Sequence, residues 1–465
     1  MSNDKSTASD TVNTYARQTA QGHQEALVTL TKKADTREKA ILVESPYVIP
    51  VIFVPGVMGS NLKKKGNRDL VWRPPNGKAD GIGTLANFYF KKTPTTRQIL
   101  FNPLTAEVDK EGPIDPGATG LSEAVLKERG WGSVHMDSYG QILVTLHHTL
   151  NNLYAQPRAP VGAAPTDEFM YRMLEDPTLW GSVSRNTQLT VADLQAMGRY
   201  RFEVWACGYN WLQSNQDSGK ELDAFIRATL KKYENPGGKP IAKQVILVTH
   251  SMGGLVVRGM LSGVPDSASR VLGVIHGVQP ASGAPSAYKR MRAGFEGVLS
   301  GILGVSATEA VPELANAPAL LEMLPFATYN DGKPWLSTSD PKRLSLPQSG
   351  NPFKDIYAST AWYGLIPEQN TKLIDPAGMV AKRIGPDKPI RENFTDTLAD
   401  VRSFQNAITQ YGYHPQTHVY CGVEHTRKTW GRVQWDGYIG PEVKNVAGCA
   451  LLYDTLAGNI KLSGL

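Results

Sequence analysis

The sequence predicts an α/β protein with a mostly parallel central sheet and helices on both of its faces, and two observations support this class. The chain contains short apolar runs rich in β-branched residues, which is the composition of strands buried on both faces. Amphipathic helical patterns separate these runs, as over residues 219–233, and strands that alternate with helices predict a parallel sheet. The expected strands are residues 47–54, 201–207, 244–249 and 271–275.

We expect one core that carries an insertion. Residues 1–46 are polar and are expected to form an arm, and residues 47–282 carry the first part of the core. From 283 to 404 the alternation fails, and this stretch, rich in Pro, Gly, Ala and aromatic residues, is expected to be a cap or lid above the sheet. Residues 405–465 are expected to return to the core with a strand over 418–423 and to leave the core incomplete at its C-terminal end.

Two apolar helical patterns lie inside the expected cap, at residues 295–305 and 314–324. The first has two interpretations. Its apolar side chains line a lipid-binding lid, or the helix is buried against the core. The side chains concerned are Phe295, Val298, Leu299, Ile302 and Leu303.

Composition and charge exclude several classes of protein. With 41% hydrophobic and 20% charged residues, the chain is expected to be globular. The formal net charge is +6, and the basic clusters are short and scattered, so no nucleic-acid partner is expected. These clusters are either solvated surface or points of peripheral contact with anionic membrane headgroups. No zinc-ligand spacing is present, so no metal is expected.

The cysteine content and the N-terminal residues indicate in which cellular compartment the protein is expected. Three cysteines cannot make a disulfide framework. The N-terminus MSNDKSTASD lacks the basic and apolar regions of a signal peptide, and no apolar run reaches about 18 residues. We therefore expect a protein that is cytoplasmic in the producing cell and that, if exported, leaves without a cleaved signal peptide.

The segment Thr249–Gly254, with the sequence THSMGG, lies between a buried strand and a helix. This is the context of a nucleophile elbow, in which a sharp turn presents Ser251 above the sheet of an α/β-hydrolase. The segment departs from the G-x-S-x-G pattern because Thr249 replaces the first glycine. The alternative is a serine that only caps a helix. We expect the neighbouring His250 to point away from the hydroxyl and to pack.

Acyl transfer needs two donors aimed at the developing oxyanion. The first is expected to be the backbone N–H of Met252, at the positive end of the following helix. The second is expected from the glycine-bearing turn Pro55–Gly59, where Val57, or else Met58, supplies an N–H. The alternative for this turn is an ordinary strand end.

With these motifs the chain resembles the lecithin:cholesterol acyltransferase-like branch of the α/β-hydrolases, and especially the bacterial lipase effectors of the type VI secretion system. The resemblance covers roughly residues 47–430, and its segments occur in family order. The matching segments are VIFVPGVMGSNL (51–62), EVWACGYNWLQSN (203–215), VILVTHSMGGLVVRGML (245–261), VIHGVQPASGAP (274–285), LLEMLPF (320–326) and HVYCGVEHTRKT (418–429).

This resemblance implies an α/β-hydrolase fold with a cap, a nucleophile at Ser251, and oxyanion donors at Met252 and Val57. It implies hydrolysis of phospholipid acyl esters, with acyl transfer to an alcohol as the related reaction and no metal or organic cofactor. By analogy with the effectors, it implies export and a partner that is an immunity or secretion-carrier protein.

A serine hydrolase also needs a histidine base and an acid that orients it. The family places the acid in a Gly-Asp-Gly-Thr-Val-Pro-like turn, followed by the histidine, and no such turn occurs up to Leu465. Three explanations stay open: both residues lie beyond Leu465, an unusual triad is drawn from within the chain, or catalysis is weak. The candidates within the chain are His414, His418 and His425 with Glu424, Asp436 and Asp454.

Three functions follow from these observations. The leading one is a serine-dependent lipolytic hydrolase of the phospholipase A type that acts through an acyl-enzyme on Ser251, in the setting of an antibacterial secreted effector. The second is an O-acyltransferase of the lecithin:cholesterol acyltransferase type, which differs only in the acceptor of the acyl group. The third is a non-catalytic lipid- or protein-binding homologue, which the unlocated acid and histidine favour.

Overall fold

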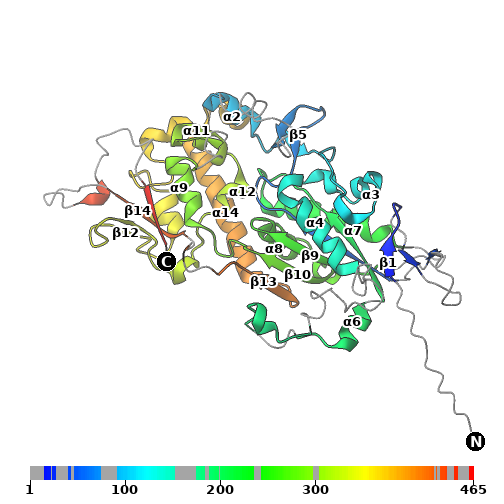
Figure 1. Ribbon diagram of the computed structural model, residues 1–465. Helices are drawn as coiled ribbons and strands as arrows, with labels where there is room; N and C mark the ends of the chain where they lie inside the picture. The colour runs from blue at the N-terminus through cyan, green and yellow to red at the C-terminus, as the bar shows by residue number, and fades with distance from the viewer. Residues whose placement is uncertain are drawn as a thin grey trace, which may run out of the picture.

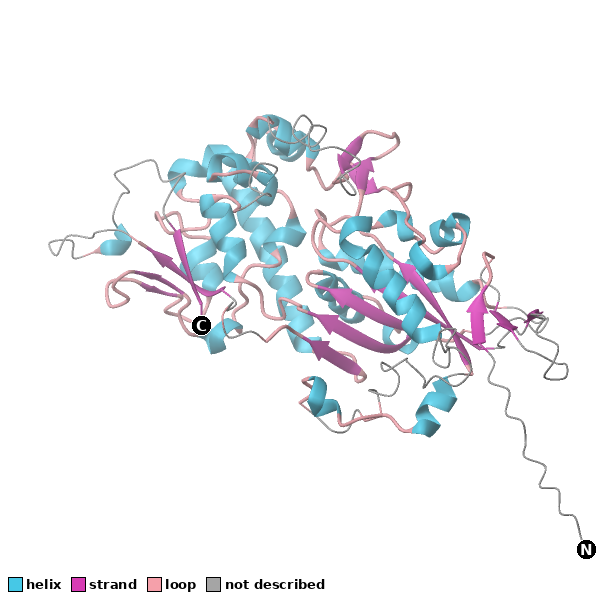
Figure 2. Cartoon of the chain, viewed as in Figure 1, coloured by secondary structure: helices cyan, strands magenta, loops and turns pink. Residues whose placement is uncertain are grey.

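The computed structural model describes residues 15–21, 24–27, 40–42, 47–74, 92–151, 174–183, 188–197, 199–234, 242–296, 303–423, 426, 430–436, 445–448 and 460–464. Its elements form two groups that lie side by side in Figures 1 and 2: a core built on the largest sheet, and a cap made mainly of helices. None of the helices in this part of the chain is long and apolar enough to cross a membrane.

The central sheet has five strands in the order β13-β10-β9-β4-β8, and every neighbouring pair is parallel. The predicted mostly parallel sheet is therefore confirmed, and the expected strands lie in it. Its members are β4 (Tyr47–Val54), β8 (Tyr200–Ala206), β9 (Val245–His250), β10 (Val271–Gly277) and β13 (Thr417–Tyr420).

Helices cover both faces of the sheet because alternate residues of a buried strand point to opposite sides. In β4, Ile52 and Val54 pack in one hydrophobic cluster with side chains of α7 and α8, while Val51 and Phe53 pack in another with side chains of α3 and α4. The helices are α3 (Glu123–Glu128), α4 (Met136–Asn151), α7 (Asn215–Lys231) and α8 (Gly253–Gly263). This arrangement confirms the α/β-hydrolase fold class.

The cap has a hydrophobic core of its own, which includes Trp335 and Phe394. A sheet in the order β12-β11-β14-β15 closes it on one side. The strands β14 and β15 come from the C-terminal region, so part of residues 405–465 joins the cap and not the central sheet. The elements are α9 (Pro285–Ala293), α11 (Ala307–Leu314), α12 (Pro318–Leu321), α13 (Met379–Ile384), α14 (Ile390–Tyr411), β11 (Leu336–Thr338), β12 (Ser345–Leu346), β14 (Trp430–Trp435) and β15 (Ile460–Gly464).

Two details of the predicted organisation differ from the structure. The pattern over 314–324 does not form one helix, because α11 ends at Leu314 and α12 starts at Pro318, a residue that suits a first helical turn and breaks a helix interior. The long helix α14 crosses the boundary placed between residues 404 and 405 and packs on α8, so it connects the cap to the core.

Smaller elements surround the two groups. The region predicted as a polar arm contains a three-stranded antiparallel sheet, and a second three-stranded sheet follows β4. These elements and two further helices are β1 (Tyr15–Gln18), β2 (Gln24–Leu27), β3 (Ala40–Leu42), β5 (Leu62–Lys64), β6 (Leu70–Trp72), β7 (Ala106–Val108), α2 (Pro94–Leu100) and α6 (Val191–Met197).

Candidate active site

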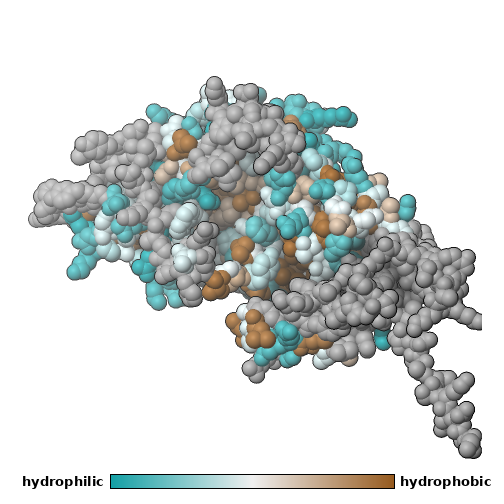
Figure 3. Space-filling model, in the orientation of Figure 1, coloured by the Kyte–Doolittle hydropathy of each residue, from teal (hydrophilic) through white to brown (hydrophobic). Residues whose placement is uncertain are grey.

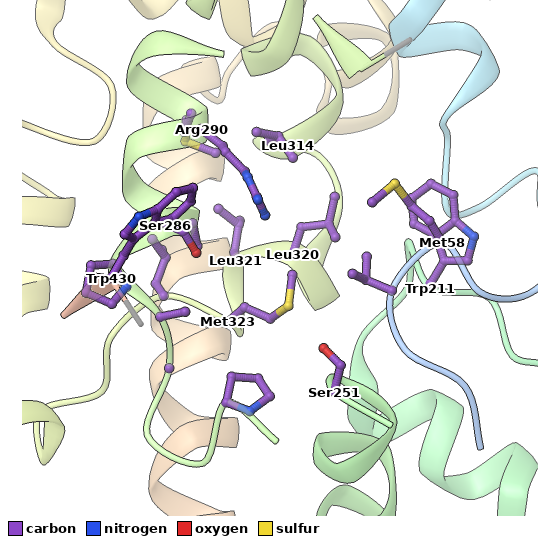
Figure 4. Close-up of a pocket in the computed structure, with 18 of the residues that line it drawn as sticks. Met58, Trp211, Ser251, Ser286, Arg290, Leu314, Leu320, Leu321, Met323 and Trp430 are labelled. Atoms are coloured by element: carbon purple, nitrogen blue, oxygen red, sulfur yellow. The ribbon is translucent and has the colours of Figure 1, made fainter. Parts of the chain in front are cut away.

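Ser251 lies in the tight turn that joins β9 to α8. Its φ of 51° is in the left-handed region, which a residue with a side chain adopts only when the surroundings impose it. The Ser251 N–H donates to the carbonyl of Gly277 at 2.8 Å, and the Ser251 carbonyl accepts from the Gly254 N–H at 3.1 Å. The side chain is half-buried, and its hydroxyl points into a cavity (Figure 4). Ser251 therefore has the geometry that the elbow pattern predicts.

The departure from the G-x-S-x-G pattern is accommodated inside the sheet. Thr249 is fully buried, and its Oγ1 forms a hydrogen bond of 2.9 Å with Nδ1 of His276 on the adjacent strand. Burial, together with the nearby Arg258, lowers the pKa of His276 to about 4, so this histidine is neutral at pH 7. Thr249 thus takes part in a hydrogen bond within the core, and Nδ1 of His276 is engaged in that bond.

The loop after β4 passes directly beside the elbow. A Cβ built on Gly56 would lie 3.0 Å from Cβ of Ser251, and the Gly59 N–H donates to the Gly56 carbonyl at 3.0 Å. Val57 follows at this turn and lines the same cavity as Ser251, whereas Met252 is the N-cap residue of α8, with a helical φ of −58°. The structure therefore brings together the three residues Ser251, Met252 and Val57 that the sequence singled out.

Two tyrosines hold this loop in place. Tyr139 of α4 accepts a hydrogen bond from the Gly56 N–H at 3.1 Å, and its hydroxyl lies 3.0 Å from Nδ1 of His250. Tyr209 donates to the Pro55 carbonyl at 3.0 Å. His250 is thus engaged away from the Ser251 hydroxyl, as expected, and burial lowers its pKa. The sequence offers no local sign of Tyr139, which is separated from His250 by 111 residues.

We expect Tyr139→Phe to lower the free energy of unfolding by about 1–2 kcal/mol, because it leaves a buried N–H and a ring nitrogen without their partner. The ring itself keeps its contact with Phe53, whose ring centroid lies 5.1 Å away. Urea unfolding at constant m-value measures the change. A loss below about 0.5 kcal/mol would show that water replaces the hydroxyl without cost.

The cavity above Ser251 has a volume of about 610 Å³ and lies between the core and the cap. Its walls are mostly apolar, with Trp211 from the core and Leu320 and Met323 from the cap (Figure 4). On the face drawn in Figure 3, hydrophobic side chains gather between these two groups of elements. Phe295 and Leu303 of the predicted lid segment line the cavity, and Val298, Leu299 and Ile302 lie outside the described residues.

The candidate acids and bases within the chain do not converge on Ser251 where the structure describes them. His414 accepts a hydrogen bond from the Gln416 N–H, and His418 is exposed on β13. Asp436 accepts from the Ser339 hydroxyl in the cap. Among the residues that the structure describes, no histidine forms a hydrogen bond with the Ser251 hydroxyl. The same residues contain no cluster of three or more His, Cys, Asp or Glu side chains that could hold a metal ion. Glu424, His425 and Asp454 lie outside the described residues.

Two ionisable side chains in the cavity wall were missed by sequence reasoning. Arg290 on α9 and Glu313 on α11 both line the cavity. Glu313 is 2% exposed, and burial raises its pKa well above its ordinary value. Nothing in the local sequence distinguishes these residues from the other charged residues of the cap, because only the packing of α9 beside α11 brings them to one cavity.

Comparisons with known proteins agree with this geometry. A family model described as lecithin:cholesterol acyltransferase matches residues 151–436, which is more than half of the chain. A comparison with curated proteins gave no match. A chain in the crystal structure of the Tle4–Tli4 complex is similar with a TM-score of 0.75 and 34% identity, over 90% of this chain and 84% of that one. With this family match, an α/β-hydrolase fold and the expected elbow, the chain belongs to the lecithin:cholesterol acyltransferase family.

Proposed function

We propose that the protein is a serine-dependent lipolytic hydrolase that cleaves acyl esters of phospholipids through an acyl-enzyme on Ser251. The observation that carries the proposal is the Ser251 hydroxyl, which is held at a left-handed turn and faces an apolar cavity of about 610 Å³. A cavity of this size and lining suits an acyl chain. Membership of the family supports the same chemistry.

In this mechanism Oγ of Ser251 attacks the ester carbonyl carbon. The charge that develops on the carbonyl oxygen is stabilised by the backbone N–H groups of Met252 and Val57. The bond to the alcohol breaks, and the alcohol leaves with the proton that came from Ser251. Water then cleaves the acyl-enzyme and releases a fatty acid. These proton transfers require a base, and His250 and His276 are engaged elsewhere.

A fluorophosphonate probe tests the nucleophile in the full-length protein. Wild-type protein is expected to be labelled on Ser251, and Ser251→Ala is expected to lose the label. The matched control is Ser262→Ala, on α8 but outside the cavity, which should label like the wild type. If the wild-type protein is not labelled, the hypothesis of a non-catalytic homologue is favoured. If Ser251→Ala is labelled, the nucleophile is a different residue.

Acyl transfer to an alcohol is the second candidate, because the matching family is described as an acyltransferase. Product analysis with acyl-labelled phospholipid separates the two reactions. We expect free fatty acid to remain the main product when an acceptor alcohol is added, because Ser251 is only half-buried and water reaches the acyl-enzyme. An acyl ester of the added alcohol as the main product would instead identify a transferase.

We also infer that the protein acts as an exported effector and binds an immunity protein. Two observations support this: the sequence resembles the type VI lipase effectors, and the similar solved chain is part of a Tle4–Tli4 complex. Co-expression with the product of an adjacent gene, followed by size-exclusion chromatography, tests the partner. A partner that co-elutes and lowers esterase activity is expected.

A further inference from the structure

The wall of the cavity above Ser251 carries two side chains that can be charged. Among the lining residues that the structure describes, Arg290 and Glu313 are the only members of the Asp, Glu, Lys and Arg class. Figure 4 shows Arg290 extending from α9 into the cavity beside Leu314, on the far side of the cavity from Ser251. A cationic side chain across the cavity from the Ser251 hydroxyl suits a ligand with a polar group some distance from its ester.

Glu313 has no partner in the described structure. Its side chain is almost fully buried, and neither carboxyl oxygen forms a hydrogen bond with the described residues. Burial, opposed by Arg97 and reinforced by Glu309, raises the pKa of Glu313 well above its ordinary value, which favours the protonated carboxyl group, a hydrogen-bond donor. Buried polar groups in folded proteins almost always have a partner. The unmatched carboxyl of Glu313 therefore indicates a ligand atom that accepts a hydrogen bond.

The charge at this wall indicates the sign of that ligand. Lys289 and Arg290 share one carboxylate, that of Glu296, which lies 3.6 Å from Nε of Arg290. Lys289 and Arg290 with the one carboxylate of Glu296 leave one positive charge, which the raised pKa of Glu313 favours keeping. The Nε of Arg290 forms no hydrogen bond in the described residues, and the guanidinium lies 5.3 Å from the Phe295 ring centroid. A cation and a neutral donor together suit an anion that is rich in acceptor oxygens.

We propose that Arg290 and Glu313 form a subsite for the phosphate group of a glycerophospholipid whose acyl ester reaches Ser251. Phosphate fits because it offers a charge to the guanidinium and acceptor oxygens to both side chains. The inference rests on the proposed function, since it takes Ser251 as the nucleophile. According to this inference, Arg290 and Glu313 make the enzyme prefer phospholipids over uncharged glycerides.

The test compares substrates with identical acyl chains in the same detergent micelles. The readout is kcat/KM on phosphatidylglycerol divided by kcat/KM on diacylglycerol. Arg290→Gln is expected to lower this ratio by about 10- to 100-fold, the usual effect of losing a charge-assisted hydrogen bond. Glu313→Leu is expected to lower it by about tenfold, whereas Glu313→Gln keeps a neutral donor and should stay within about threefold of wild type.

Lys342→Gln is the matched control, because it removes a positive charge from an exposed position of the cap outside the cavity. Its ratio should equal that of wild type. An unchanged ratio in Arg290→Gln, or equal losses on both lipids, overturns the subsite. So does a result in which Arg290→Gln relieves only inhibition by added inorganic phosphate and leaves the lipid ratio intact. Hydrolysis of p-nitrophenyl butyrate by wild type separates the two proposals: if it is absent, the proposed function fails and the subsite with it.

Discussion

Ser251→Ala is expected to lower kcat for ester hydrolysis by about 10³- to 10⁶-fold. In the proposed mechanism the variant removes the atom that forms the acyl-enzyme and leaves the proposed backbone donors of Met252 and Val57 in place. The activity that remains therefore measures what binding and the oxyanion hole provide without a nucleophile. Steady-state hydrolysis of a short-chain ester and of a phospholipid measures the loss. A decrease smaller than about tenfold would contradict the mechanism.

The backbone conformation of Ser251 leads to a separate prediction about stability. Because Ser251 has a φ of 51°, any side chain at this residue is strained, and glycine is not. Ser251→Gly should therefore be about 1 kcal/mol more stable than Ser251→Ala, although both lack the hydroxyl. Denaturant unfolding of the two variants measures the difference. Equal stabilities would show that the turn relaxes when the hydroxyl is removed. The backbone strain at residue 251 would then not be a lasting feature of the turn.

Gly253→Ala is expected to have the second largest effect. A Cβ at Gly253 would lie 2.5 Å from the carbonyl oxygens of both Val54 and Pro55. These are backbone atoms, so either the start of α8 or the end of β4 must move. We expect a loss of about 3 kcal/mol in the free energy of unfolding. We also expect at least about a hundredfold loss in kcat, because the movement separates Ser251 from Val57.

Gly254→Ala is the matched control for this variant. It is the next residue of the same helical turn, and the atoms that its Cβ would meet belong to the side chain of Gln279, the nearest at 2.8 Å. A side chain can rotate away, and alanine favours the helix over glycine by about 1 kcal/mol. We expect Gly254→Ala to change stability by about 1 kcal/mol or less. Similar losses in the two variants would contradict the requirement for close contact between β4 and α8.

Local patterns in the sequence were enough to predict the centre of the fold. The strands β4, β8, β9 and β10 are runs of apolar, β-branched residues, and burial on both faces of a parallel sheet requires that composition. The elbow was also predictable, because a strand, a serine and a glycine-rich helix start are adjacent in the chain. Ser251, Met252 and Val57 were named from these patterns alone.

The cap could not be predicted in the same way. Its core combines elements from distant parts of the chain, and β14 pairs with β11 from a region about a hundred residues earlier. The segment 314–324 looked like one helix because most of its residues are apolar, but in the structure Pro318 starts a separate helix. The long helix α14 was missed because the stretch around it lacks the alternation with strands that marked the core.

The sequence by itself determined which strands are buried, where the chain turns sharply, and which serine stands at that turn, because these features depend on residues close together in the chain. Only the tertiary structure decided that Tyr139 connects the Gly56 loop to His250, and that Arg290 and Glu313 line the cavity above Ser251. The physical reason is that these contacts join segments far apart in the chain. Their energies depend on burial and distance, which no local pattern encodes.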